Sequence, residues 1–282
     1  MILIADSGST KTSWCVAENG NPLQQLQTSG INPYFQSAEE IRARLNEELF
    51  PQLVIDKNEI HAVYFYGAGC TFDKVEVVKG VIENLMNTAV VEVNTDLLAA
   101  ARGVCGRQAG IACILGTGSN SCFYDGRKIV QNVSPLGYIL GDEGSGAVLG
   151  KLLIGDLLKG MMTEELKDKF LQQYNLTPAL IIDRVYRQPF PNRFLAGFAP
   201  FLAENLHEPM IYKLVLNSFK SFFTRNVMQY DHKFLQVHFT GSIAFYFMPI
   251  LSEAATLTGI RMGYIKESPL QGLVAFHSSR IF

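Results

Sequence analysis

The chain has 282 residues and a formal net charge of −2 at pH 7, so its charge gives no reason to expect nucleic acid or an anionic membrane as a partner. Hydrophobic residues make up 48% of the chain and charged residues 18%, which is typical of a globular protein with well-buried cores. This length allows two modest α/β domains.

Neither membrane spans nor metal sites are recognisable in the sequence. No apolar run approaches the roughly 18 residues of a membrane span, and the N-terminal segment lacks the basic flank and cleavage site of a signal peptide. The five cysteines stand apart without a CxxC pair, and the five histidines lack metal-site spacing. We therefore expect a cytoplasmic protein with reduced thiols and without zinc or an iron–sulfur cluster.

The first 16 residues predict a β-hairpin. An apolar run at residues 2–5 ends at Asp6, a small-residue turn follows at residues 7–10, and residues 12–16 form a second strand-like run. The hydroxyls and backbone N–H groups of such a turn suit phosphate oxygens, and Asp6 suits a hydrated Mg²⁺. Turns of this composition also occur without a ligand, so this stretch alone leaves both interpretations open.

The same plan recurs at residues 111–120, where an apolar strand leads into Gly116-Thr117-Gly118-Ser119 and a further strand is expected at residues 121–124. Two such turns suggest two related halves that each offer a loop to one ligand. This arrangement resembles the ATP site of the actin/sugar kinase/Hsp70 type. Neither a P-loop motif nor a strand-linked GxGxxG motif is present.

Strands and helices alternate between these two turns. We expect strands at residues 23–28, 61–66 and 89–93, and helices at residues 37–50 and 74–86. Short connections between such elements favour a mixed or parallel sheet flanked by helices.

Asp96 follows the strand predicted at residues 89–93 and precedes a helix predicted at residues 97–104. The carboxyl ends of strands are where α/β folds place their ligands. Thr95 or Asp96 also suits the N-cap of that helix, so the local sequence leaves a structural role open.

The glycine-rich segment 103–110 is the best candidate for a domain boundary. We therefore predict an N-terminal domain at residues 1–106 and a C-terminal domain at residues 107–282. The second domain is expected to hold strands at residues 128–132 and 234–239 and a largely helical insertion at residues 163–226. The last helix, residues 269–279, is expected to pack back on the N-terminal domain.

Two further turns in the second half combine small and polar residues. Asp142 and Glu143 lie in the turn at residues 141–146, where acids suit the dipole of the helix that follows, but where the small residues suggest backbone close to a bound molecule. The turn at residues 240–242 follows a predicted strand and precedes a helix, a place suited to adenine or ribose.

These stretches together resemble the N-acetylglucosamine kinase family, which belongs with the BadF/BadG/BcrA/BcrD-type ATPases. The most specific part of the resemblance is GTGSN, residues 116–120, followed by GDEGS, residues 141–145. It implies an α/β fold of two ribonuclease H-like, actin-like ATPase domains, with mixed sheets flanked by helices and the active site in the interdomain cleft. The implied reaction transfers the γ-phosphoryl group of ATP to the 6-hydroxyl of an amino sugar.

The resemblance also implies roles for individual residues. Asp96 matches the general base and Asp6 the position that holds Mg²⁺. Besides Asp96, the sugar-binding positions are matched by Asn32, Ser119, Asn120, Pro135, Leu136, Gly137 and Asp142. The nucleotide-binding positions are matched by Ser9, Thr10, Lys11, Thr117, Ala196, Gly241 and Ser242.

Several questions stay open at the level of the sequence. Leu136-Gly137-Tyr138 and Pro33-Tyr34 depart from the family's pattern beside the sugar, so the acceptor is N-acetylglucosamine, glucosamine or N-acetylmuramic acid. An ATPase activator of the BadF kind and a non-catalytic sugar or nucleotide sensor are the alternative functions. Proteins of this fold often form homodimers, and the sequence does not determine the oligomeric state.

Overall fold

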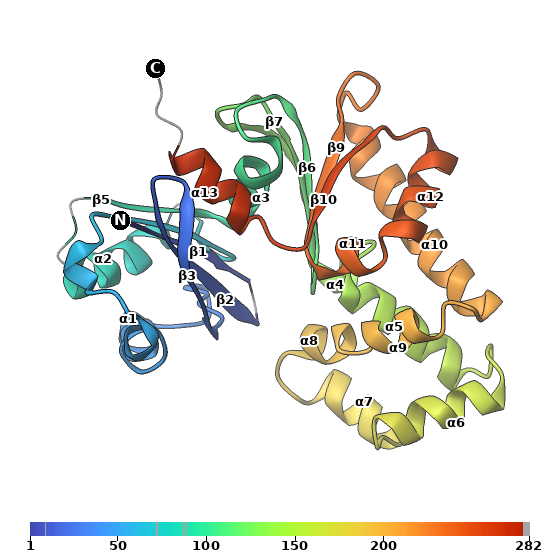
Figure 1. Ribbon diagram of the computed structural model, residues 1–282. Coiled ribbons are helices and arrows are strands. Elements are labelled where there is room, and N and C mark those ends of the chain that lie inside the picture. Colours follow the sequence, from blue (N-terminus) through green and yellow to red (C-terminus); the bar gives the residue numbers. More distant parts are fainter. Residues whose placement is uncertain (9, 72, 87, 89, 279–282) are drawn as a thin grey trace. The chain divides into compact units, whose positions relative to one another are not determined.

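The computed structural model describes residues 1–282 except 9, 72, 87, 89 and 279–282 (Figure 1). The chain forms two compact units, which are described separately below. Unit 1 comprises Met1–Gly110, Tyr124–Val130 and the described part of Ser268–Phe282. Unit 2 comprises Ile111–Phe123 and Gln131–Glu267. The predicted division into domains at residues 1–106 and 107–282 remains a prediction.

The first sheet has five strands in the order β3-β2-β1-β4-β5. Strand β1 pairs antiparallel with β2 and parallel with β4, while β2–β3 is antiparallel and β4–β5 parallel. The strands are β1 (Ile2–Ser7), β2 (Lys11–Glu18), β3 (Asn21–Ser29), β4 (Ala62–Gly67) and β5 (Val90–Thr95). The hairpin predicted from the first 16 residues is therefore present.

Helices cover both faces of this sheet. Successive side chains of a strand point to opposite faces, so Leu3 and Ala5 of β1 pack in one core and Ile4 in another. The first core includes Ile41 and Val78 from the helices α1 (Ala38–Arg44) and α2 (Val75–Leu85). The second includes residues of α3 (Asp96–Cys105) and of α13 (Leu270–Ser278). Burial on both faces explains why β1 is an almost continuous apolar run.

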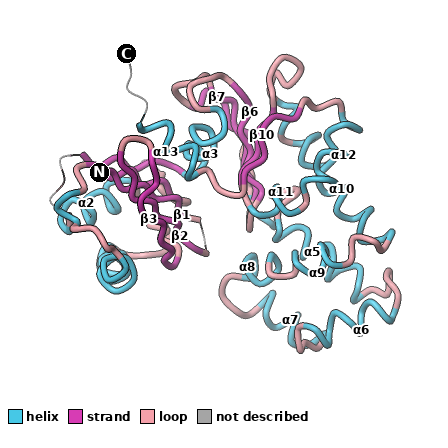
Figure 2. Tube along the Cα trace, in the orientation of Figure 1, coloured by secondary structure: helices cyan, strands magenta, loops and turns pink. Residues whose placement is uncertain are grey.

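The second sheet has the order β10-β9-β6-β7-β8, and Figure 2 labels β6, β7 and β10 among its strands. Strand β9 lies parallel to both β6 and β10. The strands are β6 (Gly110–Leu115), β7 (Ser119–Tyr124), β8 (Ile129–Val133), β9 (Val237–Thr240) and β10 (Met262–Lys266). With β1 equivalent to β6, the two sheets have the same strand order, which is the repeat that the two glycine–hydroxyl turns predicted.

The remaining α-helices of the described residues all belong to unit 2. They are α4 (Gly137–Leu140), α5 (Gly146–Leu158), α6 (Glu164–Gln173), α7 (Pro178–Tyr186), α8 (Pro191–Ala196), α9 (Ala199–Glu204), α10 (Pro209–Arg225), α11 (Ser242–Tyr246) and α12 (Met248–Thr258). Phe222 and Phe223 of α10 are fully buried against Phe239 of β9. These aromatic residues therefore serve the core.

The sequence prediction missed one strand and misplaced parts of others. Strand β10 was not predicted, since its exposed and half-buried residues do not form an apolar run. The strand predicted at residues 234–239 begins only at Val237. The helix predicted at residues 37–50 ends at Arg44 and continues as a π-helical turn, Leu45–Leu49. Residue 89 of the third predicted strand and residue 279 of the last predicted helix lie outside the described residues.

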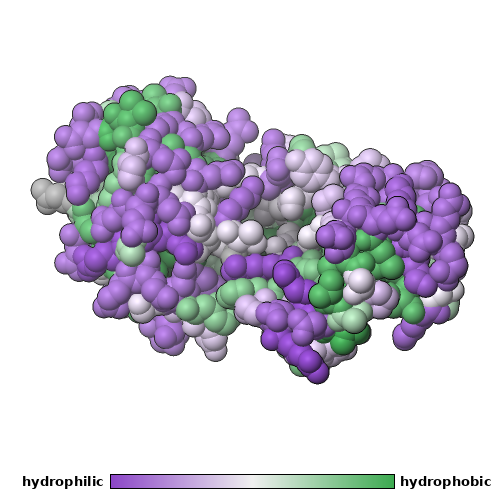
Figure 3. Space-filling view, turned by 90° about the horizontal axis from the view of Figure 1, so that it is seen from below, coloured by the Kyte–Doolittle hydropathy of each residue, from purple (hydrophilic) through white to green (hydrophobic). Residues whose placement is uncertain are grey.

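Hydrophilic residues cover much of the surface in the view of Figure 3, with apolar patches among them. In the part of the chain that the structure describes, no helix is both long enough and apolar enough to span a membrane.

Candidate functional site

The parallel strands of unit 1 end at one edge of the sheet. Their register aligns Ser7 of β1 with Gly67 of β4, and Gly67 with Thr95 of β5. Asp6 and Asp96 therefore lie at the same edge, two strand spacings or about 10 Å apart along the sheet. Two carboxylates at the carboxyl ends of parallel strands are placed as the sequence predicted.

Asp96 is the first residue of α3, and Thr95 is the N-cap, since the Leu98 N–H donates to Thr95 Oγ1 at 3.2 Å. The Leu97 N–H donates to Asp96 Oδ1 at 2.8 Å. Among the described residues, no other residue donates a hydrogen bond to Oδ2, although the backbone N–H of Asp96 itself also interacts with this carboxylate. Burial raises the pKa of Asp96, although backbone N–H groups oppose this rise. The capping role thus belongs to Thr95, and Asp96 keeps one oxygen available to a ligand.

The surroundings of Asp6 disfavour the ionised form of its carboxyl group. Burial raises the pKa of Asp6 to about 7, and repulsion from Asp96 adds to the rise, while Lys11 partly opposes it. A divalent cation would relieve this repulsion. The described residues contain no group of three or more potential metal ligands. Mg²⁺ commonly takes only one or two carboxylates and completes its shell with water and phosphate oxygens, so Asp6 fits such an ion.

Asn32 lies beside the turn that follows β4. A Cβ atom on Gly69 would come within 2.1 Å of Asn32 Oδ1, so only glycine fits there. The Tyr34 N–H donates to the same oxygen at 2.9 Å, and the Asn32 N–H donates to Gln36 Oε1 at 2.7 Å. These contacts hold Asn32 at the edge that also carries Asp6 and Asp96.

The β1–β2 turn is closed by a hydrogen bond from the Gly8 N–H to the Lys11 carbonyl at 3.0 Å. Thr10 and Lys11 are exposed, as a nucleotide-binding turn requires, whereas Ser9 lies outside the described residues. Ser7 is fully buried, and its hydroxyl bonds Thr12 Oγ1 at 2.6 Å and the Ile31 carbonyl at 2.9 Å. Ser7 therefore joins the turn to the segment before Asn32.

Unit 2 brings together its four predicted nucleotide-binding positions. The Gly146 N–H donates to the Gly116 carbonyl at 2.8 Å, and the Ala147 N–H to the Thr117 carbonyl at 3.0 Å. A Cβ atom on Gly146 would lie 3.1 Å from Ala196 Cβ. Gly241, with φ +109°, approaches Leu115 and Gly116 so closely that its own Cβ would meet the Leu115 carbonyl at 2.3 Å. These contacts place Thr117, Ala196 and Gly241 near the end of β6, and Ser242 follows Gly241 along the chain.

The predicted sugar-binding residues of unit 2 form a second cluster. The Asp142 N–H donates to the Pro135 carbonyl at 2.8 Å, which closes the loop that holds Leu136 and Gly137. The Ser119 N–H donates to Asp142 Oδ1 at 3.2 Å. Leu136 and Asp142 have φ values of +61° and +55°, a strained backbone typical of functional loops. Burial raises the pKa of Asp142 to about 6.

Ser119 Oγ is buried without a hydrogen-bond partner in the described structure, and such a group calls for an explanation. Ser119 is 6% exposed and adjoins Asn120. A water molecule or ligand group at this place would satisfy the hydroxyl.

The turn at residues 141–146 is also held by contacts that were not predicted from the sequence. Glu143 forms an ion pair with Arg225 at 2.5 Å and accepts from Asn226 Nδ2 at 3.2 Å, and the Gly144 N–H donates to Ser218 Oγ at 3.2 Å. These partners lie on or just after α10, far along the chain from the turn, so no local sequence signal identifies them.

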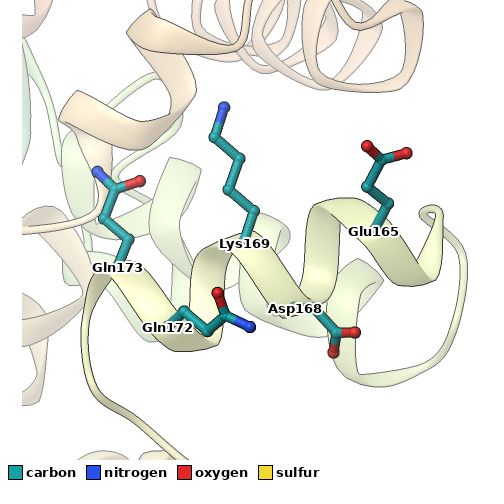
Figure 4. A pocket seen from close by; sticks show the side chains of 5 residues that line it. All are labelled: Glu165, Asp168, Lys169, Gln172 and Gln173. Carbon is teal, nitrogen blue, oxygen red and sulfur yellow. The ribbon is translucent and has the colours of Figure 1, made fainter.

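A groove on α6 contains none of the predicted residues. Glu165, Asp168, Lys169, Gln172 and Gln173 all project from this one helix (Figure 4). Lys169 already donates to Asn205 Oδ1 at 2.6 Å and Gln173 to Glu204 at 3.1 Å. This groove is therefore not a candidate site.

Comparison with solved structures finds a nearly identical fold. A candidate N-acetylglucosamine kinase from Porphyromonas gingivalis is 54% identical, covers 99% of each chain and gives a TM-score of 0.97. A second one, from Chromobacterium violaceum, is 18% identical over 98% of this chain and 99% of that chain, with a TM-score of 0.75. A ROK family glucokinase from Streptomyces griseus, in complex with glucose and AMPPNP, is 15% identical over 98% and 97%, with a TM-score of 0.61.

No protein-family model matches the sequence, and a comparison with curated proteins gives no match. The two more distant structures show the fold alone, which is the α/β fold of actin-like ATPases and sugar kinases. The P. gingivalis structure carries the conclusion about the family, because its identity extends over nearly the whole of both chains. The chain belongs to the N-acetylglucosamine kinase-like family.

Proposed function

We propose that this protein is an ATP-dependent amino-sugar kinase that transfers the γ-phosphoryl group of ATP to the 6-hydroxyl of N-acetylglucosamine or a close relative. The observation that carries the proposal is Asp96, whose Oδ1 is held by the N-terminus of α3 while Oδ2 remains free at the edge of the sheet. The name of the 54% identical P. gingivalis structure supports the same activity.

Asp96 acts as the general base. Phosphoryl transfer needs mainly positioning of the reactants and a modest acceptor for the hydroxyl proton. The Leu97 N–H fixes the carboxylate through Oδ1, so Oδ2 is aimed by the rigid start of a helix rather than by a loop. Burial raises the pKa of Asp96, which brings its basicity closer to that needed at neutral pH.

Asp6 is the residue that would hold Mg²⁺ when the nucleotide is bound. The ion, when bound, supplies positive charge that offsets the developing negative charge on the phosphates. Lys11, which lies near enough to Asp6 to lower its pKa, adds a second positive charge at this turn.

The nucleotide is bound by Ser9, Thr10 and Lys11 in unit 1 and by Thr117, Ala196, Gly241 and Ser242 in unit 2. Within unit 2, glycine at positions 146 and 241 lets the backbone segments around Gly116, Ala196 and Gly241 lie close together.

The sugar is bound by amides and carboxylates at the ends of strands. Asn32 and Asp96 contribute from unit 1, and Ser119, Asn120, Asp142 and the loop Pro135-Leu136-Gly137 from unit 2. A site built of such buried polar groups rejects a sugar that leaves one of them unpaired.

A screen for sugar-dependent ADP release tests the proposal. Purified protein with ATP and Mg²⁺ is assayed against glucose, glucosamine, N-acetylglucosamine, N-acetylmannosamine and N-acetylmuramic acid. We expect an amino sugar to give the highest kcat/KM. ATP hydrolysis that no sugar stimulates would favour an ATPase activator, and sugar binding without ADP release would favour a sensor. Either outcome would contradict the proposal.

A further inference from the structure

The amide of Asn120 has a fixed orientation. Its Oδ1 accepts a hydrogen bond from the Ser121 N–H at 2.9 Å and a second one from Asn132 Nδ2, also at 2.9 Å. Both donors are N–H groups, so the atom that faces them must be the amide oxygen rather than the nitrogen. Two donors use both lone pairs of that oxygen.

Only the Nδ2 group of Asn120 remains to meet a ligand. No hydrogen bond from this nitrogen is found among the described residues, and an amide nitrogen can donate but not accept. Asn120 is half-buried, at the start of β7 and next to Ser119, whose buried hydroxyl also lacks a partner. The side chain is therefore prepared to donate to an acceptor atom.

Asn132 on β8 is the residue that imposes this orientation. Its Nδ2 donates to the Ser121 carbonyl at 2.7 Å and to the Val133 carbonyl at 3.1 Å, besides Asn120 Oδ1. Tyr230, which is 5% exposed, contacts both strands of the pair formed by β7 and β8. Its hydroxyl donates to the Ser121 carbonyl at 2.9 Å and accepts from the Val133 N–H at 2.8 Å.

Asn32 of unit 1 provides a comparison. Its Oδ1 also accepts a backbone N–H, that of Tyr34, but no side chain among the described residues donates to it. The orientation of Asn32 thus depends on a backbone turn, whereas that of Asn120 depends partly on a side chain that substitution can remove.

We propose that Asn132 is a positioning residue for sugar specificity, which holds Asn120 as an obligatory hydrogen-bond donor to the acceptor sugar. This inference rests on the proposed function. The sugar atom that meets Asn120 must then be an acceptor, either a ring hydroxyl oxygen or an acyl carbonyl oxygen. A sugar group that can only donate would face the donating Nδ2 group of Asn120 without forming a hydrogen bond, so this contact discriminates between sugars.

Two substitutions of Asn132 test the inference. Asn132→Leu removes the donor at similar volume, and Asn132→Asp places a carboxylate against Asn120 Oδ1 and two carbonyl oxygens. We expect the sugar KM to rise about tenfold in Asn132→Leu and further in Asn132→Asp, because each loses the side-chain contact that orients the Asn120 amide. The kcat is expected to stay within about twofold, and the ATP KM to stay unchanged. Gln131→Leu, on the same exposed edge of β8, is the matched control and should leave the sugar KM unchanged.

Sugar analogues provide a second measurement that does not depend on the variants folding. In the wild-type protein, 3- and 4-deoxy analogues are compared with the matching fluoro analogues, and the N-acetyl group with its thioacetyl counterpart. Fluorine accepts weakly but cannot donate, and sulfur accepts less well than oxygen. If Asn120 donates to a ring hydroxyl oxygen, we expect the fluoro analogue to bind better than the deoxy analogue at that one ring position. If Asn120 donates to the acyl carbonyl oxygen, we expect the thioacetyl sugar to bind more weakly than the N-acetyl sugar.

The outcomes separate this inference from the proposed function. A wild-type protein that phosphorylates no sugar would overturn both. Normal wild-type turnover with an unchanged sugar KM in both folded Asn132 variants would overturn this inference alone. Analogue series in which neither expected difference is found would also overturn this inference alone.

Discussion

The carboxyl group of Asp6 keeps its proton to a higher pH than an exposed aspartate, and this affects stability. Its pKa rises from 3.8 to about 7, so between these values the folded state binds more protons than the unfolded state. The contribution of this group to stability is therefore present at low pH and is lost as the pH rises through about 7. In the absence of ATP and Mg²⁺, we expect Asp6→Asn to raise the Tm at pH 8 and to leave it almost unchanged at pH 4.

Thermal unfolding at the two pH values checks this prediction. A stability gain of 1 kcal/mol corresponds to a shift of about 2–4 °C for a chain of this size class. Asp168→Asn, at an exposed position on α6, is the control and should have little effect at either pH. An equal shift for Asp6→Asn at pH 4 and pH 8 would contradict the account.

The raised pKa of Asp142 predicts that kcat/KM for the sugar depends on pH. Burial raises its pKa to about 6, and only the ionised form can accept hydrogen bonds from a sugar through both oxygens. The kcat/KM for the sugar should therefore fall as the pH decreases through about 6, whereas Asp142→Asn should be less active at neutral pH and lack this fall. A pH–rate profile at saturating ATP measures it, and an unchanged profile in the variant would assign the titration to another group.

At the level of elements, α5 shows how close packing places Ala196, a proposed nucleotide-binding residue. A Cβ atom on Gly150 would lie 2.0 Å from the Leu195 carbonyl, directly before Ala196 on α8, whereas a Cβ atom on Gly155 would meet nothing within 4 Å. Gly150→Ala must push α8 away, and such overpacking costs about 1–3 kcal/mol. Gly155→Ala should instead stabilise the protein by about 0.5–1 kcal/mol, since alanine favours a helix.

These two substitutions in one helix form a matched pair. Chemical denaturation gives the change in the free energy of unfolding for both, and the KM for ATP reports on Ala196. We expect Gly150→Ala alone to raise the KM for ATP. Equal destabilisation by the two substitutions would show that α5 and α8 do not pack as described.

The elements that the sequence predicted well are those whose signal is local. The apolar run of β1 and the start of the helix after β5 both depend on neighbouring residues, and both were predicted with small errors at the ends, with Thr95 and Asp96 left as alternative N-caps. Strand β10 was missed for a physical reason. Gly263 lies against the His238 ring, and His238 Nδ1 accepts from the Tyr264 N–H at 2.9 Å, so a distant residue defines this edge strand.

The same reasoning applies to the candidate site. Asp96 and Asp142 are recognisable because each follows a strand or lies in a glycine-rich turn, and the structure places both at strand ends or in a strained loop. Asn132, Arg225 and Tyr230 were not recognisable, since each acts on a residue that only folding brings near.

At the scale of the whole molecule, the chain repeats one plan. Both sheets have the same strand order, and each starts with two strands joined by a turn of glycine and hydroxyl residues. The first copy is accompanied by the carboxylates Asp6 and Asp96, and the second by the loop that ends at Asp142. The proposed reaction uses this asymmetry, because the base comes from the first copy and much of the sugar recognition from the second.

The most direct test is the activity of Asp96→Asn with the best sugar of the screen. The variant keeps the shape of the side chain and the contact with the Leu97 N–H, but it cannot accept the hydroxyl proton. We predict a loss of kcat of about 10²–10⁴-fold with ATP binding retained, while Glu92→Gln, at an exposed position on β5, remains active. Near-normal turnover in Asp96→Asn would contradict the assignment of the base, and with it the central claim.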